Sequence, residues 1–153
     1  MQPTCLSCEL IAGARDLPGG RIHSTQHWVV EHCVGPLGVG TLIVKPFRHC
    51  VHVGPLNRGE ADELGPLLAQ ASACVQQLAG AEQVYVCLWS HGGWSPGHIH
   101  FVVQPSWAHL RERYASPGPT VQSEQLRANV VPPRPDVEAF SARARRWPGW
   151  AAA

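Results

Sequence analysis

Two thiols and two imidazoles in this chain have the right chemical types for a metal site. Cys5 and Cys8 form a Cys-x-x-Cys pair near the N-terminus, while His49 and His98 lie much further along the sequence. Two cysteines and two histidines are a common tetrahedral ligand set for zinc. Because the two halves are far apart in sequence, their spacing supports a zinc site only as a hypothesis, and small buried thiols are the alternative.

A second histidine follows closely after His98. Residues 97–104 are rich in apolar side chains and predict a strand, in which residues i and i+2 share a face. His98 and His100 should therefore point to the same side, about 7 Å apart, given a rise of about 3.3 Å per residue. Two imidazoles on one face can serve a ligand, although the chain has nine histidines and a chance pairing is the alternative.

The segments that would position these residues alternate between strand-like and helix-like patterns. We predict strands at residues 27–34, 40–45, 83–89 and 97–104, with a glycine-rich loop at 90–97. An amphipathic helix is predicted at residues 56–78, and Gly65-Pro66 should kink it or mark its true start. Shorter helices are expected at residues 5–13, 107–114 and 137–146. This order predicts an α+β fold with an antiparallel sheet.

The tail after Pro105 differs from the rest of the chain because it is rich in proline. We predict a core of residues 1–105 and a C-terminal extension of residues 106–153 that packs on the same domain. A length of 153 residues suits a single domain with a substantial core.

Composition limits the classes of function. The formal net charge of +1 argues against a protein that mainly binds nucleic acid, but it is compatible with a small anionic ligand. No apolar run approaches the roughly 18 residues of a membrane span, and the N-terminus lacks the basic segment of a secretory signal. We therefore expect a cytoplasmic protein without a membrane partner. Its six cysteines are expected to be thiols or metal ligands.

Three stretches of the sequence together resemble the histidine-triad (HIT) superfamily. They are CLSCELIAG at residues 5–13, GTLIVKPFRH at 40–49 and GWSPGHIHFVVQP at 93–105. The last resembles the family signature His-φ-His-φ-His-φ-φ, where φ is apolar, with a glycine-rich turn before it and a proline after it. The order and separations of the three stretches agree from Cys5 to Pro105.

This resemblance implies a fold and a cofactor. The fold is an antiparallel sheet of about five strands with a long helix and small C-terminal helices. In zinc-bearing relatives the ligands match Cys5, Cys8, His49 and His98 of this chain. Four protein ligands close the coordination shell, so the zinc would be structural rather than a Lewis acid. The resemblance further implies a homodimer.

The resemblance also implies chemistry at phosphorus. The second signature histidine matches His100, the residue that attacks the α-phosphorus of a nucleotide derivative and forms a nucleotidyl-histidine intermediate. Ser95 matches a serine that contacts phosphate, and the loop that holds Gly93 can offer backbone N–H groups. His91, in the same loop, can supply a further polar contact, although a solvated loop histidine is the preferred interpretation.

One departure from the signature bears on activity. The third signature position is Val102, and valine cannot donate a hydrogen bond to a phosphate or a leaving group. The leading hypothesis is a nucleotidyl hydrolase or transferase, and the alternative is a non-catalytic nucleotide-binding protein. Lys45 and Arg48 can assist an anionic ligand, but their position predicts a solvated turn.

Overall fold

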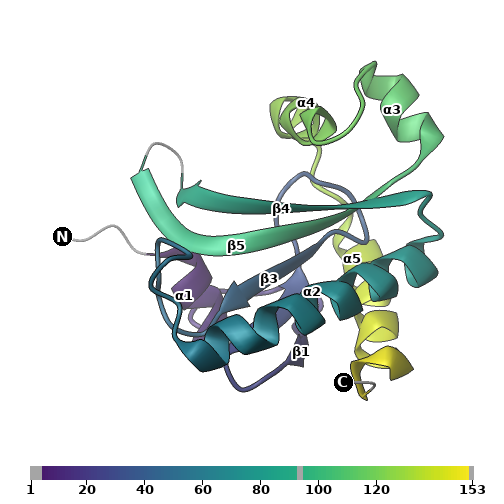
Figure 1. Ribbon diagram of the computed structural model, residues 1–153. Coiled ribbons are helices and arrows are strands. Elements are labelled where there is room, and N and C mark those ends of the chain that lie inside the picture. Colours follow the sequence, from purple (N-terminus) through teal and green to yellow (C-terminus); the bar gives the residue numbers. More distant parts are fainter. Residues whose placement is uncertain (1–4, 93–94, 152–153) are drawn as a thin grey trace.

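The computed structural model describes residues 5–92 and 95–151, and an antiparallel sheet of five strands forms its centre. The strands are β1 (Arg21–Ser24), β2 (Trp28–His32), β3 (Leu42–Pro46), β4 (Gln83–Gly92) and β5 (Ser95–Ser106). They lie in the order β1-β2-β3-β5-β4, so β1 and β4 are the edge strands (Figure 1). The predicted α+β fold with about five antiparallel strands is confirmed.

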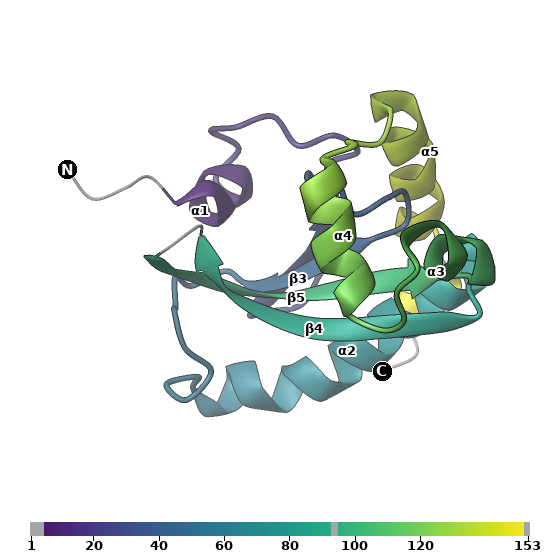
Figure 2. The same ribbon diagram turned by 90° about the horizontal axis from the view of Figure 1, so that it is seen from above.

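Helices cover both faces of this sheet. α2 (Arg58–Ala79) lies along one face, whereas α1 (Leu6–Ile11) and α4 (Thr120–Ala128) lie on the opposite side, as Figure 2 shows. α3 (Ala108–Tyr114), α5 (Arg134–Arg145) and the final short turn η1 (Pro148–Ala151) complete the described chain. No helix in these residues is long and apolar enough to cross a membrane.

Alternation along the central strands gives the two faces of the sheet different chemistry. On β3, Leu42 and Val44 are fully buried in the main hydrophobic cluster, which α2 covers with Leu67 and Val75. The intervening Ile43 points to the other face, because side chains alternate along a strand. The face of the sheet under α2 therefore forms the core, and the opposite face is available for polar groups.

The C-terminal extension shares this core. Phe140 and Ala144 of α5 belong to the same buried cluster as Trp28 and Leu42. This contact supports our proposal that the residues after 105 pack on the domain formed by residues 1–105.

Pro66 lies inside α2 and does not mark its start, which corrects one of the two predicted roles of Gly65-Pro66. The helix begins at Arg58 because Asn57 caps it, and the Glu60 N–H donates to Asn57 Oδ1 at 2.9 Å. Pro66 cannot donate to the carbonyl of Asp62, but both residues are exposed, so water can satisfy that carbonyl.

The predicted glycine-rich loop at residues 90–97 is wrong in its extent. β4 and β5 continue to the hairpin end, where Gly92 pairs with Ser95. Gly93, one of the predicted site residues, lies outside the described residues, as does Trp94.

The sequence pattern does not reveal α4, because much of its buried side is polar. Gln122 and Gln125 are buried next to Val121. Gln122 Oε1 accepts a hydrogen bond from Trp89 Nε1 at 3.1 Å, and Gln125 accepts one from Gln104. These amides attach α4 to the sheet without the apolar spacing that predicts a packed helix.

Candidate metal centre and adjoining pocket

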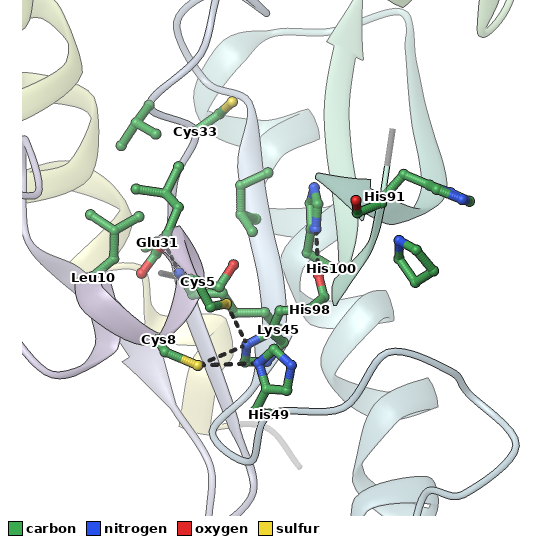
Figure 3. A pocket seen from close by; sticks show the side chains of 17 residues that line it. Cys5, Cys8, Leu10, Glu31, Cys33, Lys45, His49, His91, His98 and His100 are labelled. Atoms are coloured by element: carbon green, nitrogen blue, oxygen red, sulfur yellow. Dashed lines mark hydrogen bonds and ion pairs between the residues drawn. The ribbon is translucent and has the colours of Figure 1, made fainter. Parts of the chain in front are cut away.

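The four predicted metal ligands lie together, although they come from three parts of the chain. The ligand atoms of Cys5, Cys8, His49 and His98 all lie within 4.8 Å of one another. His98 Nδ1 is 3.7 Å from Cys5 Sγ and 3.5 Å from Cys8 Sγ, and His49 Nδ1 is 3.3 Å from Cys8 Sγ. Figure 3 shows the four side chains pointing toward one another.

Three separations within this cluster match those of a tetrahedral zinc site. Zn–S bonds of about 2.3 Å and Zn–N bonds of about 2.0 Å hold ligand atoms about 3.3–3.8 Å apart. The three separations that join a sulfur to a ring nitrogen fall in this range. His98 Nε2 donates to the Pro46 carbonyl at 2.9 Å, which leaves the Nδ1 lone pair facing both sulfurs.

Burial keeps His98 in the form that a metal needs. Desolvation lowers the pKa of His98 to about 4, so its imidazole is neutral near pH 7. Burial, together with Cys5, raises the pKa of Cys8 to about 11. A bound cation would favour the thiolate and oppose that effect.

An irregularity in β5 brings His98 to the end of β3. The pairing of β4 with β5 shifts register between Trp89 and His91. Within this stretch the Ile99 N–H donates to the Cys50 carbonyl at 2.9 Å. β5 therefore turns from its partner β4 toward the segment that carries His49.

Arg48 is exposed in a bend, as predicted, and its guanidinium group also holds the segment before His49 in place. Its Nε and Nη2 donate to the two carboxylate oxygens of Glu60 at 2.8 and 2.7 Å. Glu60 is only 2% exposed and also accepts from the Asn57 N–H at 2.8 Å. The hydrogen bonds from Arg48 hold the pKa of Glu60 at about 2. The start of α2 and the turn that carries His49 are thus one connected unit.

A pocket of about 850 Å³ adjoins the cluster, between α1 and the hairpin of β4 and β5. Its lining includes the predicted site residues His91, Ser95 and His100. His91 and Ser95 are exposed, and His100 is half-buried. The structure thus places these three residues around one cavity, whose lining also includes the four residues of the Cys/His cluster.

The backbone fixes the tautomer of His100. Its Nδ1 lies 3.0 Å from the His98 carbonyl oxygen, which can only accept, so Nδ1 carries the proton. Nε2 is left with a free lone pair. Burial lowers the pKa of His100, so the ring is neutral near pH 7. A neutral imidazole with a free nitrogen is a competent nucleophile.

Val102 is packed among apolar side chains. It is 2% exposed and forms a small cluster with Cys33 and Leu37, against which Ile43 and Trp89 pack. The position next to His100 on this face of β5 is therefore apolar.

A buried ion pair that the sequence pattern does not reveal also lines this pocket. Lys45 Nζ donates to Glu31 Oε1, and both residues line the cavity. Lys45 is 1% exposed and lies in β3, so the prediction of a solvated turn is wrong for this residue. Its place in β3, two residues after Ile43 on the same face, is the signal that could have revealed it.

Comparison with known proteins gives relatives by structure only. No family profile and no curated protein matches the sequence. A zinc-bound histidine triad family protein from Mycobacterium smegmatis aligns with 97% of this chain and 94% of its own, at 16% identity and a TM-score of 0.66. A Hit-like protein involved in cell-cycle regulation from Bartonella henselae, with an unknown ligand, aligns with 95% of this chain and 97% of its own, at 12% identity and a TM-score of 0.70.

A third solved structure, a hypothetical histidine triad nucleotide-binding protein from Sulfolobus tokodaii, aligns with 92% of this chain and 89% of its own, at 15% identity and a TM-score of 0.70. These likenesses show that the chain has the fold of the histidine-triad proteins. The predicted resemblance is confirmed at the level of the fold.

The Arg48–Glu60 contact gives a stability prediction. Glu60→Gln should lower the free energy of unfolding by about 1–3 kcal/mol at pH 7, because a buried amide cannot accept from both guanidinium N–H groups. The pKa of Glu60 is lowered to about 2 in the folded state, so its contribution is complete above the unfolded value near 4.5 and is lost as the pH falls toward 2.

Urea unfolding at pH 7 and pH 3 tests this prediction, and the difference between wild type and variant should shrink at the lower pH. Asp62→Asn is the matched control, since its ion pair with Arg58 is exposed and worth about 0–1 kcal/mol. Equal losses in the two variants would contradict the assigned role of Glu60.

Proposed function

We propose that the protein is a nucleotidyl hydrolase or transferase that acts at the α-phosphate of a nucleotide derivative. The observation that carries this proposal is the free Nε2 of His100 in a pocket beside the metal cluster, with its tautomer fixed by the His98 carbonyl. The pocket is large enough for a small-molecule ligand. The likeness to a protein described as nucleotide-binding adds support.

In the proposed reaction, Nε2 of His100 forms a bond to phosphorus while the bond to the leaving group breaks. Water or an acceptor alcohol or amine then attacks the nucleotidyl-histidine and restores the free imidazole. The Ser95 hydroxyl and the backbone N–H groups around Gly93 would hold the phosphate oxygens. His91 would supply a further polar contact at the same side of the pocket.

We propose that Cys5, Cys8, His49 and His98 hold a structural zinc ion. Four protein ligands leave no open position for substrate, so the metal would contribute folding free energy rather than Lewis-acid chemistry. The zinc-bound relative from Mycobacterium smegmatis supports this cofactor. We also propose a small-molecule ligand rather than nucleic acid, and a cytoplasmic location, as the sequence predicts.

A second candidate function is a nucleotide-binding protein without turnover. It is favoured by Val102, which places a buried apolar cluster where the family signature has a polar group. In that case the pocket retains its ligand and His100 forms no covalent bond.

The metal assignment predicts about one zinc per chain in protein purified without chelators. Cys5→Ser should abolish zinc binding and lower the melting temperature, because a thiolate ligand of the closed shell is lost. Cys74→Ser is the control, since Cys74 is a fully buried core thiol on α2 and should affect stability without changing zinc content. Elemental analysis measures both, and a metal-free wild type would refute the assignment.

The catalytic assignment predicts a nucleotidyl adduct on His100, detected by mass spectrometry after rapid quenching with a slow substrate. His100→Ala should abolish both adduct and turnover. Val102→His should raise hydrolysis by about 10²-fold, because it adds a hydrogen-bond donor beside the reacting group. Val102→Leu tests the effect of a larger side chain without a polar atom.

Wild-type protein that binds mononucleotides but shows neither adduct nor turnover would favour the binding-protein alternative. Wild-type protein that binds no nucleotide would contradict both functions.

We further propose a homodimer that uses the free edge of β4. This strand ends the sheet, and Val86 and Leu88 on it are 41% and 45% exposed. Light scattering at micromolar concentration should give about twice the 16.6 kDa chain mass. Leu88→Glu should shift the mass toward the monomer, whereas Val131→Glu, at an exposed position between α4 and α5, should not. A wild-type monomer would count against the proposal.

A further inference from the structure

Lys45 is the only lysine in a chain that otherwise carries its positive charge on arginine. Its side chain is 1% exposed and that of its partner Glu31 is 3% exposed, and both line the pocket that contains His100. A buried ion pair is seldom worth its desolvation, and apolar side chains of similar volume often replace one without loss of stability. Packing alone therefore gives no reason for this pair.

The ammonium group of Lys45 has unused hydrogen-bonding capacity. It carries three N–H donors, and Glu31 Oε1 is its one hydrogen-bond partner among the residues that the structure describes. Two donors are thus free in a cavity that can admit a ligand. An anionic oxygen is the partner that would satisfy a buried ammonium best.

The charges around Lys45 leave the site positive. Burial raises the pKa of Glu31, and the nearby charges of Lys45 and Arg21 oppose this effect. Two cations thus lie near one carboxyl group, so the three groups together keep a positive charge in either protonation state of Glu31. A phosphate that approaches Lys45 from the pocket meets an attractive field as well as free N–H groups.

Lys45 and His100 serve neighbouring parts of the same cavity. Val44 of β3 pairs with Phe101 of β5 in an antiparallel register. Lys45 follows Val44 and His100 precedes Phe101, so the two residues are neighbours on adjacent strands, and both line the pocket. Figure 3 shows the Lys45 side chain directed toward Glu31 on the α1 side, away from the imidazole of His100. A group bound by Lys45 would therefore lie beside the phosphoryl group at His100 and would be distinct from it.

We propose that Lys45, positioned by Glu31, binds a second phosphate of the ligand next to the phosphoryl group at His100. The preferred substrates are then nucleoside diphosphates and polyphosphates, rather than nucleotide derivatives whose leaving group is uncharged. This substrate preference rests on the proposed function, in which His100 attacks the substrate. Binding of a phosphate by Lys45 does not depend on catalysis.

Because Lys45 is unique, its ammonium can be observed directly. Protein grown with ¹⁵N-lysine gives a single side-chain Nζ resonance, which we expect to shift and saturate on titration with inorganic pyrophosphate. Calorimetry on the same protein should show that ADP binds at least about tenfold more tightly than AMP, because the second phosphate adds a charge-assisted contact. An unshifted Lys45 signal at saturating pyrophosphate would overturn the proposal.

The matched variant is Lys45→Met combined with Glu31→Gln, which removes both charges and leaves no orphan carboxylate in the interior. It should fold, judged by its melting temperature, and bind ADP and AMP with equal affinity. Arg58→Met loses the same positive charge from an exposed site on α2 and should keep the wild-type preference.

The outcomes separate this proposal from the proposed function. Equal binding of ADP and AMP by wild type, with an adduct on His100, overturns the role of Lys45 and leaves the catalytic assignment intact. A saturable pyrophosphate shift at Lys45 without any nucleotide adduct supports the anion site and contradicts catalysis. Retention of the ADP preference in the double variant also overturns the role of Lys45.

Discussion

The imidazole of His98 connects three segments that are distant in sequence, and the site depends on this connection. Its Nε2 is hydrogen-bonded to the carbonyl of Pro46 at the end of β3, and its Nδ1 faces the sulfurs of Cys5 and Cys8 at the start of α1. α1 has six residues, one of them buried, and no side-chain cap. Such a short helix has little intrinsic stability. The Cys/His cluster is therefore the main attachment of α1. Because α1 forms one wall of the pocket, the cluster holds that wall in place as well.

The same sheet supports the fold on one face and the site on the other. On β3, Leu42 and Val44 are buried under α2. The alternate residues Ile43 and Lys45 point to the opposite face and line the pocket. A one-residue slip of β3 would exchange these sets and place a charge in the core. The tight pairing of Glu31 with Lys45, across β2 and β3, consequently contributes to register as well as to the character of the cavity. Stability and recognition are coupled through these strands.

Much of this arrangement can be predicted from sequence, and the exceptions have physical causes. The CxxC pair, His49 and His98 can be grouped because thiol and imidazole ligands belong to a small set of metal chemistries. The α+β order and α2 follow from hydrophobic periodicity. β1 and α4 do not, because β1 has only four residues and the buried side of α4 includes Gln122 and Gln125. Lys45 and Arg48 are polar residues near a turn, and their pairing with Glu31 and Glu60 depends on tertiary contacts that no local pattern records.

Val102 and Lys45 give the sheet around His100 an apolar part and a charged part. Val102, two residues after His100 on β5, belongs to an apolar cluster against which Trp89 packs. Lys45 lies on the adjacent strand β3 and holds its ammonium group in a buried position. The interaction of this group with another charge is weakly screened there. The buried charges of the cavity thus lie on β2 and β3. Since the Cys/His cluster brings α1 against β5 and the segment that carries His49, its four residues also position the wall of the pocket beside Lys45.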